Sequence, residues 1–259
     1  MRLLAALLLA LPGPALAGAW TLPEGEGLTI LTLSHTTTDR FFDGLGALDR
    51  GADLDKTEAS VYLEYGLREG LTAIGQSTLS IRELGGATPD ERTGLDYTEL
   101  GLRARLAQPG PWVVSVQGSA RVPGASEPAS PAEIGLTEFE ADGRLLLGRG
   151  FAWGERTGYA DLQLGWRQRF DAPPNELRTD LTVGVRPVPE WLLIAQAFGT
   201  FADGSARTPF TDASNVKAQL SAAYELAPGW TAQVGAFATV WGEDAAQEVG
   251  GLLSLWRAF

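Results

Sequence analysis

Residues 112–122 read WVVSVQGSARV, and this stretch decides the fold class. Trp112, Val114 and Val116 fall on one face of an extended strand, whereas Ser115 and Arg121 fall on the other. Alternation with a period of two is typical of a β-strand whose faces meet different surroundings. Strands of soluble proteins average about 5–6 residues, whereas a tilted strand that crosses a bilayer needs about 9–11. The length of this stretch therefore favours a membrane-spanning strand.

The same alternation recurs from one end of the chain to the other. It predicts twelve strands, most of them about 10 to 13 residues long, separated by turn residues. These strands begin near Gly27, Thr57, Leu71, Leu95, Trp112, Glu138, Gly158, Leu177, Trp191, Ser214, Thr231 and Gln247. The segments near Gly27, Leu71 and Trp191 alternate poorly, so the sequence does not assign their faces.

The connections between these segments alternate in kind. Tight turns such as residues 66–70 and 108–111 are followed by connections that are mostly longer and more acidic, at residues 36–56, 85–94, 124–137 and 202–213. Two connections of this second kind are short, DAPPNE at 171–176 and GEDAAQ at 242–247. Tryptophan lies beside four tight turns, at Trp112, Trp153, Trp191 and Trp230. Short turns at one end, longer loops at the other and an aromatic girdle are typical of an outer-membrane barrel.

The first twenty residues, MRLLAALLLALPGPALAGAW, have the layout of a secretory signal peptide. A single positive charge, Arg2, precedes a Leu/Ala run and a Pro-Gly-Pro break. Ala15 and Ala17 then provide small residues for cleavage before Gly18. The alternative is a buried N-terminal helix, but such a helix rarely carries a break followed by a small-residue site. We predict an exported protein with a signal peptide at 1–17 and one domain at 18–259.

The amino-acid composition excludes several classes of protein. After the signal, the longest uncharged stretch lies between Glu225 and Glu243 and contains Pro228, Gly229 and Gly235, so it does not fit a membrane helix of about 20 apolar residues. An exported chain of this kind is either a soluble β-protein or a barrel, because lipid admits only helices and closed barrels. The absence of cysteine excludes thiolate catalysis and disulfides. A net charge of −12 argues against nucleic-acid binding.

The last eight residues, LLSLWRAF, predict how the sheet closes. Leu253, Leu255 and Phe259 share one face of a final strand, which must pair with the first strand if no edge is left open. The ending resembles the C-terminal assembly signal of bacterial outer-membrane proteins, which end on Phe with apolar residues at alternate upstream positions. It departs from that pattern at Arg257, where an aromatic residue is usual. The resemblance implies that the assembly machinery of the outer membrane recognises this end.

A looser resemblance covers most of the mature chain. AWTLPEGEGLTILTLSHTTTDRFFD at 19–43, YLEYGLREGLTA at 62–73 and LGLRARL at 100–106 resemble XagA-type and phenol-degradation-type outer-membrane barrel proteins. This resemblance implies a porin-like barrel but names no substrate.

Polar side chains of a lipid-facing barrel point inward, which predicts an inner wall rich in arginine. The pore-lining basic residues expected are Arg103, Arg105, Arg121, Arg144, Arg167, Arg169, Arg178 and Arg186. Acidic side chains are interspersed, and those nearest the seam include Glu58, Glu225 and Glu248. These groups could line an aqueous pathway that selects polar or anionic solutes. They could instead pair and fill the lumen, for example Arg144 with Asp161. Twelve strands fall between the eight that leave a filled interior and the 16–18 that leave a channel.

An enzymatic function is not expected. His35 is the only histidine. A twelve-stranded outer-membrane phospholipase uses a His-x-Ser motif with an Asn partner, but Thr37 occupies the serine position here and no matching Asn motif follows. One histidine cannot build a multi-histidine metal site, and the acidic stretch 39–55 lacks a calcium-loop signature. We therefore expect no catalytic residue, no metal and no cofactor.

The sequence as a whole predicts an all-β, twelve-stranded, antiparallel up-and-down transmembrane β-barrel in the outer membrane of a Gram-negative bacterium. The expected function is passive passage of small polar or anionic solutes. The alternatives are a closed-lumen structural barrel and a soluble periplasmic β-protein that binds a ligand. The expected partners are outer-membrane lipid, lipopolysaccharide and the assembly machinery, and nucleic acid is not among them.

Overall fold

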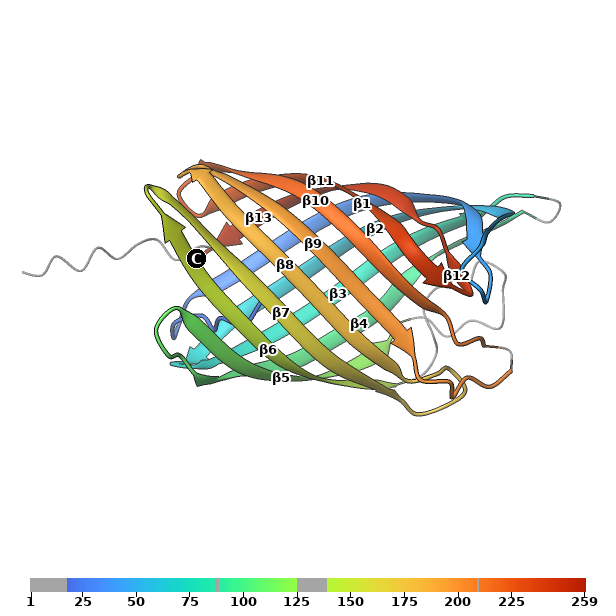
Figure 1. The fold of residues 1–259 in the computed structure, drawn as a ribbon, viewed down its shortest axis with the longest axis horizontal. Helices are drawn as coiled ribbons and strands as arrows, with labels where there is room; N and C mark the ends of the chain where they lie inside the picture. The colour runs from blue at the N-terminus through green and yellow to red at the C-terminus, as the bar shows by residue number, and fades with distance from the viewer. Residues whose placement is uncertain (1–17, 87–88, 125–138, 209) are drawn as a thin grey trace, which may run out of the picture.

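A computed structural model describes residues 18–86, 89–124, 139–208 and 210–259. In this part of the chain antiparallel strands close into a barrel (Figure 1). Twelve long strands form the wall, and a two-residue strand adds a short pairing at one rim. The predicted fold class is thus confirmed. The expected signal peptide and nearly all of the expected loop 124–137 lie outside the described residues, and in the described part no helix is long and apolar enough to cross a membrane.

The strands follow the chain in order around the wall. They are β1 (Gly27–Phe42), β2 (Leu48–Arg68), β3 (Leu71–Leu84), β4 (Asp90–Ala107), β5 (Trp112–Pro123), β6 (Glu140–Trp153), β7 (Arg156–Arg169), β8 (Glu176–Val188), β9 (Trp191–Ala202), β10 (Ser214–Ala227), β11 (Trp230–Glu243) and β13 (Val249–Ala258). The short strand β12 (Ala245–Ala246) pairs with the end of β1.

The barrel closes between its last and first wall strands. β13 pairs with β11 on one side and with β1 on the other, as the sequence predicts. At the end of the chain the Gly27 amide donates to the Phe259 carbonyl at 2.7 Å, and the Phe259 amide donates back at 2.9 Å. The Phe259 ring covers Gly27, where a Cβ would lie 2.3 Å from it. Closure leaves no free sheet edge.

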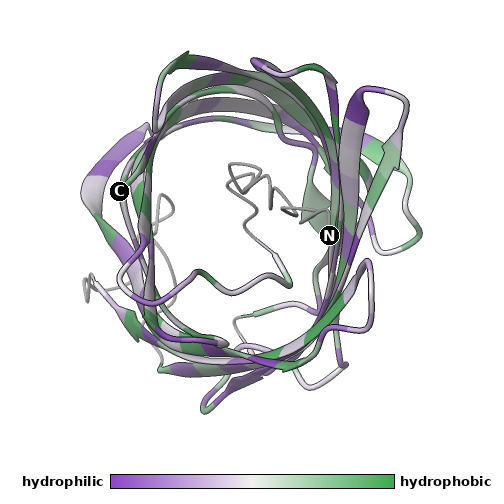
Figure 2. Cartoon of the chain, turned by 90° about the vertical axis from the view of Figure 1, so that its left-hand side faces the viewer, coloured by the Kyte–Doolittle hydropathy of each residue, from purple (hydrophilic) through white to green (hydrophobic). Residues whose placement is uncertain are grey.

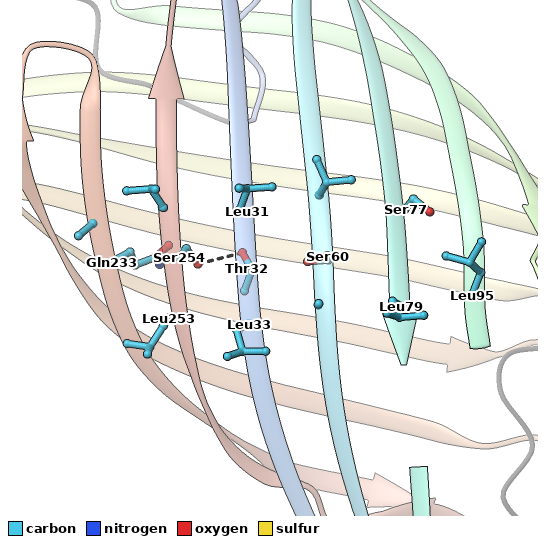
Figure 3. A pocket seen from close by; sticks show the side chains of 14 residues that line it. Leu31, Thr32, Leu33, Ser60, Ser77, Leu79, Leu95, Gln233, Leu253 and Ser254 are labelled. Atoms are coloured by element: carbon cyan, nitrogen blue, oxygen red, sulfur yellow. Dashed lines mark hydrogen bonds between the residues drawn. The ribbon is translucent and has the colours of Figure 1, made fainter. Parts of the chain in front are cut away.

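The two faces of the seam differ in polarity (Figure 3). Thr32 and Ser254 hydrogen-bond to each other at 2.9 Å across the β1–β13 pair. Their neighbours Leu31, Leu33 and Leu253 are more than half exposed. These leucines line an apolar hollow of about 720 Å³ on the outward side of the wall. An apolar outer band of this kind is what lipid-facing strands require.

Strand faces elsewhere follow the alternation predicted from the sequence. Ser115 is fully buried, whereas its neighbour Val116 is exposed on the outer face. Leu164 is exposed outward, and Gln163 points to the lumen, where it hydrogen-bonds to Asp161. The four tryptophans beside tight turns are between 38% and 46% exposed. An apolar outer surface with aromatic residues at its rim therefore surrounds a polar interior.

The expected loop at residues 36–56 is wrong. β1 continues to Phe42 and β2 begins at Leu48, and the two pair as far as Phe42 with Leu48. The hairpin turns on Asp43, whose Oδ1 accepts hydrogen bonds from the amides of Leu45 and Ala47, both at 2.8 Å. Gly46 supplies a positive φ of 79° in this turn. Residues 48–53 are exposed on both faces, so no alternation marks this end of the strand.

Two other boundaries differ from the prediction for a similar reason. β4 begins at Asp90 instead of near Leu95, and its first residues pair with the end of β3. The expected connection 242–247 contains β12, which pairs with Phe41 and Phe42. Strand ends that extend beyond the apolar band have water on both faces, which removes the period-two signal.

Candidate functional site in the barrel lumen

The register of three adjacent strands brings basic side chains onto one buried carboxylate. Arg121 on β5 and Arg169 on β7 lie directly opposite Glu140 on β6. Arg169 Nε is 2.6 Å from Glu140 Oε1, and Arg121 pairs with the other oxygen. Arg167 Nε also approaches Glu140, at 3.5 Å. The Glu140 side chain has no exposed area, so these three guanidinium groups compensate its charge in place of water.

A second carboxylate continues this cluster onto β8. Glu176 lies 2.8 Å from Arg169, 3.4 Å from Arg167 and 3.5 Å from Arg178. Positive and negative groups thus alternate across β5 to β8. Charges this deeply buried are stabilised only when each has a close partner of opposite sign.

Asp142 connects this cluster to Arg144, because it lies 3.3 Å from Arg167 and 2.8 Å from Arg144 Nε. Arg144 Nη1 also pairs with Asp180 on β8. The expected pairing of Arg144 with Asp161 is wrong. In the register of β6 and β7, Arg144 faces Gly165 and Gly148 faces Asp161, so the two side chains lie at different levels of the wall.

Arg103 is the most buried of the expected pore-lining arginines. The residue is 2% exposed, and its guanidinium lies 2.8 Å from Glu64, which is fully buried. Arg103 also donates to the Tyr62 hydroxyl at 3.3 Å and to the Trp20 carbonyl at 3.0 Å. This arginine therefore holds parts of the chain together inside the barrel.

A cavity of about 360 Å³ lies beside the Glu140 cluster. It is lined by Asp96, Tyr97, Arg121, Arg167, Arg169, Glu176, Arg178, Phe198, Thr200, Asn215 and Lys217. Five of these side chains are basic and two are acidic, so the lining carries an excess of positive charge. Tyr97 adds an aromatic face, with the Arg121 guanidinium 4.2 Å from the centre of its ring.

The cavity lies toward the rim that carries the longer connections. Arg169 ends β7 and Glu176 begins β8, and the connection between them belongs to that rim. Asn175 links it to the connection after β9, where Asn175 Nδ2 donates to Asp203 Oδ2 at 2.9 Å. Slight desolvation raises the pKa of the exposed Asp203 carboxyl, but hydrogen bonds from Ser205 and Asn175 outweigh this and hold the pKa below its usual value. The two loops next to the cavity are therefore tied together.

The stretch before β1 runs through the interior of the barrel (Figure 2). The Ala19 amide donates to Asp161 Oδ2 at 2.7 Å, and Ser115 Oγ donates to the Ala19 carbonyl. The Leu22 amide donates to Thr72 Oγ1 at 2.8 Å. Ala19 is fully buried. Residues 18–26, which we call the lumen segment, are thus bound to the walls of β3, β5 and β7.

Apolar packing supports the lumen segment near the tight-turn rim. The Trp20 ring packs edge-on against Tyr159, with centroids 5.9 Å apart. It also covers Gly148, where a Cβ would lie 2.6 Å from the ring. Residue patterns alone do not identify this segment as a lumen element. The signal available was the inward position of Gly148 beside Leu146 and Tyr159, which belong to the buried apolar clusters that Trp20 contacts.

The remaining expected pore-lining residues lie at other levels of the barrel. Arg105 and Arg186 lie at the tight-turn rim, where Arg105 pairs with Glu69 and Arg186 donates to the Pro189 carbonyl at 3.1 Å. Glu225 is exposed at the same rim. Glu58 and Glu248 share Lys56, at 3.5 Å and 3.2 Å. Lys217 pairs with Glu248 as well.

His35 lies on the outer face of β1. Its Nδ1 hydrogen-bonds with Thr57 Oγ1 at 3.0 Å on the adjacent strand. Thr37, two residues further along β1, has the same outward register.

Comparison with known proteins agrees with the fold. No family model matches the chain, and no curated protein matches it. Among solved structures it is similar to the COG4313 outer membrane channel from Pseudomonas putida F1, with 16% identity, a TM-score of 0.72, and coverage of 92% of this chain and 97% of that chain. The NanC porin matches with 11% identity and a TM-score of 0.53 over 87% of this chain and 98% of that chain. The KdgM porin matches with 7% identity and a TM-score of 0.53 over 89% and 99%.

These identities show a shared barrel fold and nothing finer. The expected resemblance to XagA-type and phenol-degradation-type proteins finds no support in a family model and stays a prediction.

Proposed function

We propose that this protein is an outer-membrane channel that lets small anionic solutes cross passively. Its closed barrel, apolar outer band and rim tryptophans fit a bilayer environment. The similar solved structures are outer-membrane channels and porins, which supports this location. We further propose that the chain is exported by the signal peptide at 1–17 and cleaved between Ala17 and Gly18.

The basic cavity is the observation that carries the preference for anions. Its lining has five basic side chains against two acidic ones. Within a narrow, low-dielectric passage, an excess of one sign concentrates solutes of the opposite sign. Arg178 and Lys217 are the most exposed of these cations, with 22% and 32% of their side chains accessible. They are therefore placed to meet an anion first, and the more deeply buried arginines set the potential behind them.

Ion selectivity tests this proposal. We expect the double change of Arg121→Gln and Arg178→Gln to shift the reversal potential toward cation selectivity in planar bilayers under a salt gradient. Glutamine is used because it removes charge without adding an unpaired buried carboxylate. The matched control is Arg149→Gln, since Arg149 stacks over the Trp112 ring at 4.9 Å on the outer face. An unchanged reversal potential in a conducting double variant would rule out the anion pathway.

A closed-lumen barrel without transport is the second candidate. Two observations favour it, namely the lumen segment bound across the interior and the pairing of most lumen charges. Planar-bilayer conductance separates the two functions, because only the channel gives discrete current steps that exceed the bare membrane current.

A further inference from the structure

Asp161 differs from the other buried acids of the lumen. It is 2% exposed, and within the described part of the chain no lysine or arginine forms an ion pair with it. Its oxygens accept hydrogen bonds from Gln163 Nε2 at 2.8 Å and from the Ala19 amide at 2.7 Å. An ionised carboxylate at this depth is costly unless a cation compensates it.

The lumen segment brings its first residue against this carboxylate. A Cβ built on Gly18 would lie 2.8 Å from both Asp161 Cγ and Oδ2. The backbone nitrogen of Gly18 is attached to the same Cα and lies about 2.5 Å from that Cβ position. Gly18 N is therefore no more than about 5.3 Å from the carboxylate. A φ of 143° at Gly18 suits glycine and lets the backbone pass this close.

We propose that the α-ammonium group of Gly18, created by signal-peptide cleavage, pairs with Asp161 and latches the lumen segment inside the barrel. The inference rests on the proposed cleavage site. Water hydrolyses the Ala17–Gly18 peptide bond at a signal peptidase, which leaves a carboxylate on Ala17 and an amine on Gly18. That amine takes up a proton near neutral pH, since free α-amino groups have a pKa of about 8.

This ion pair can form only after export, so the lumen segment is fixed in the barrel only once the signal peptide has been removed. In the uncleaved chain the Gly18 nitrogen is a neutral amide, so Asp161 is stabilised by its two hydrogen bonds and by the more distant charge of Arg103. After cleavage the same nitrogen carries the missing positive charge, and the contacts of Ala19, Trp20 and Leu22 hold it in place. Asp161 is thus a positioning residue for the lumen segment.

Amine labelling of the full chain, expressed with its leader and purified from outer membranes, tests the latch. Mass spectrometry should first show an N-terminus at Gly18. A small N-hydroxysuccinimide ester then labels the α-amine near neutral pH, and the N-terminal peptide is quantified. We expect Asp161→Asn to label about tenfold faster or more, the factor that follows from losing a hydrogen bond between charged groups.

Asp180→Asn is the matched control, because it removes a lumen charge that pairs with Arg144 instead of the segment. It should label at the wild-type rate. If Asp161→Asn does not reach the membrane, inserting Gly-Ser before Gly18 decides the question, because two residues move the amine about 7 Å. Wild-type labelling rates in both variants, or an N-terminus other than Gly18, would overturn the latch. Labelling does not depend on transport, so this failure would leave the anion-channel proposal standing.

Discussion

Glu140 illustrates how single residues stabilise the lumen. Three guanidinium groups surround its fully buried carboxylate, at distances of 3.5 Å or less. We expect Glu140→Gln to lower the free energy of unfolding by about 3–5 kcal/mol, because three arginines would be left without their shared countercharge. Glu99→Gln is the control, since Glu99 is partly exposed, pairs with Arg121 and accepts a hydrogen bond from Ser119. It should cost about 1 kcal/mol or less. Urea titration followed by heat-modifiability gels measures both, and equal losses would contradict this account of the cluster.

The sequence predicts which way the lumen residues point but not what they touch. Alternation places Arg144 and Asp161 on the inner face, because parity along a strand depends on local sequence alone. Their partners depend on the stagger between strands, which residue patterns do not encode. Arg144 consequently pairs with Asp180, two strands away, and Asp161 binds the backbone of Ala19.

At the scale of the strand, the lipid and lumen faces of β10 should respond differently to the same charge. Leu220 lies mid-strand and is 69% exposed on the outer face, whereas its neighbour Gln219 faces the lumen and bonds to Gln196 at 2.8 Å. Leu220→Arg should cost about 2–4 kcal/mol near the bilayer midplane. Gln219→Arg should cost much less, because the lumen is polar. Refolding titrations in lipid vesicles compare the two, and similar penalties would mean that the faces are reversed.

The sequence predicts a strand wherever lipid and lumen lie on its opposite faces. It does not predict how far that strand extends beyond the bilayer. The segment Trp112–Pro123 is placed within one residue because both its faces are defined by their surroundings. The outer end of the β1–β2 hairpin was not predicted, since residues 48–53 of β2 are exposed on both faces and include the acids Asp49 and Asp53. Pairing alone holds that end in strand conformation.

For the whole molecule, the contacts inside the barrel are the part that the sequence does not predict. The contact between Ala19 and Asp161 joins positions 142 residues apart. No local pattern specifies such a contact, and the same apolar stretch could equally begin an unbound linker. The position of the lumen segment can therefore be recognised only from the closed barrel, in which inward-facing glycine and aromatic residues meet the start of the chain.

Closure also makes the end of the chain a test of assembly. Phe259 stays 56% exposed on the outer rim while its backbone pairs with Gly27. Burying one aromatic contributes about 1.5–3 kcal/mol, too little to unfold a closed barrel. If the assembly machinery recognises this end, Phe259→Asp should slow insertion in cells far more than it slows refolding into detergent.

Trp153→Asp provides the comparison, since Trp153 is an aromatic of similar exposure, 46%, at a tight turn of the same rim. It removes apolar area without altering the chain end, so its insertion in cells should stay close to that of the unaltered chain. Pulse-chase fractionation measures the rate at which each variant reaches the outer membrane. If Phe259→Asp arrives as fast as Trp153→Asp, the terminal aromatic acts only as one more residue of the girdle.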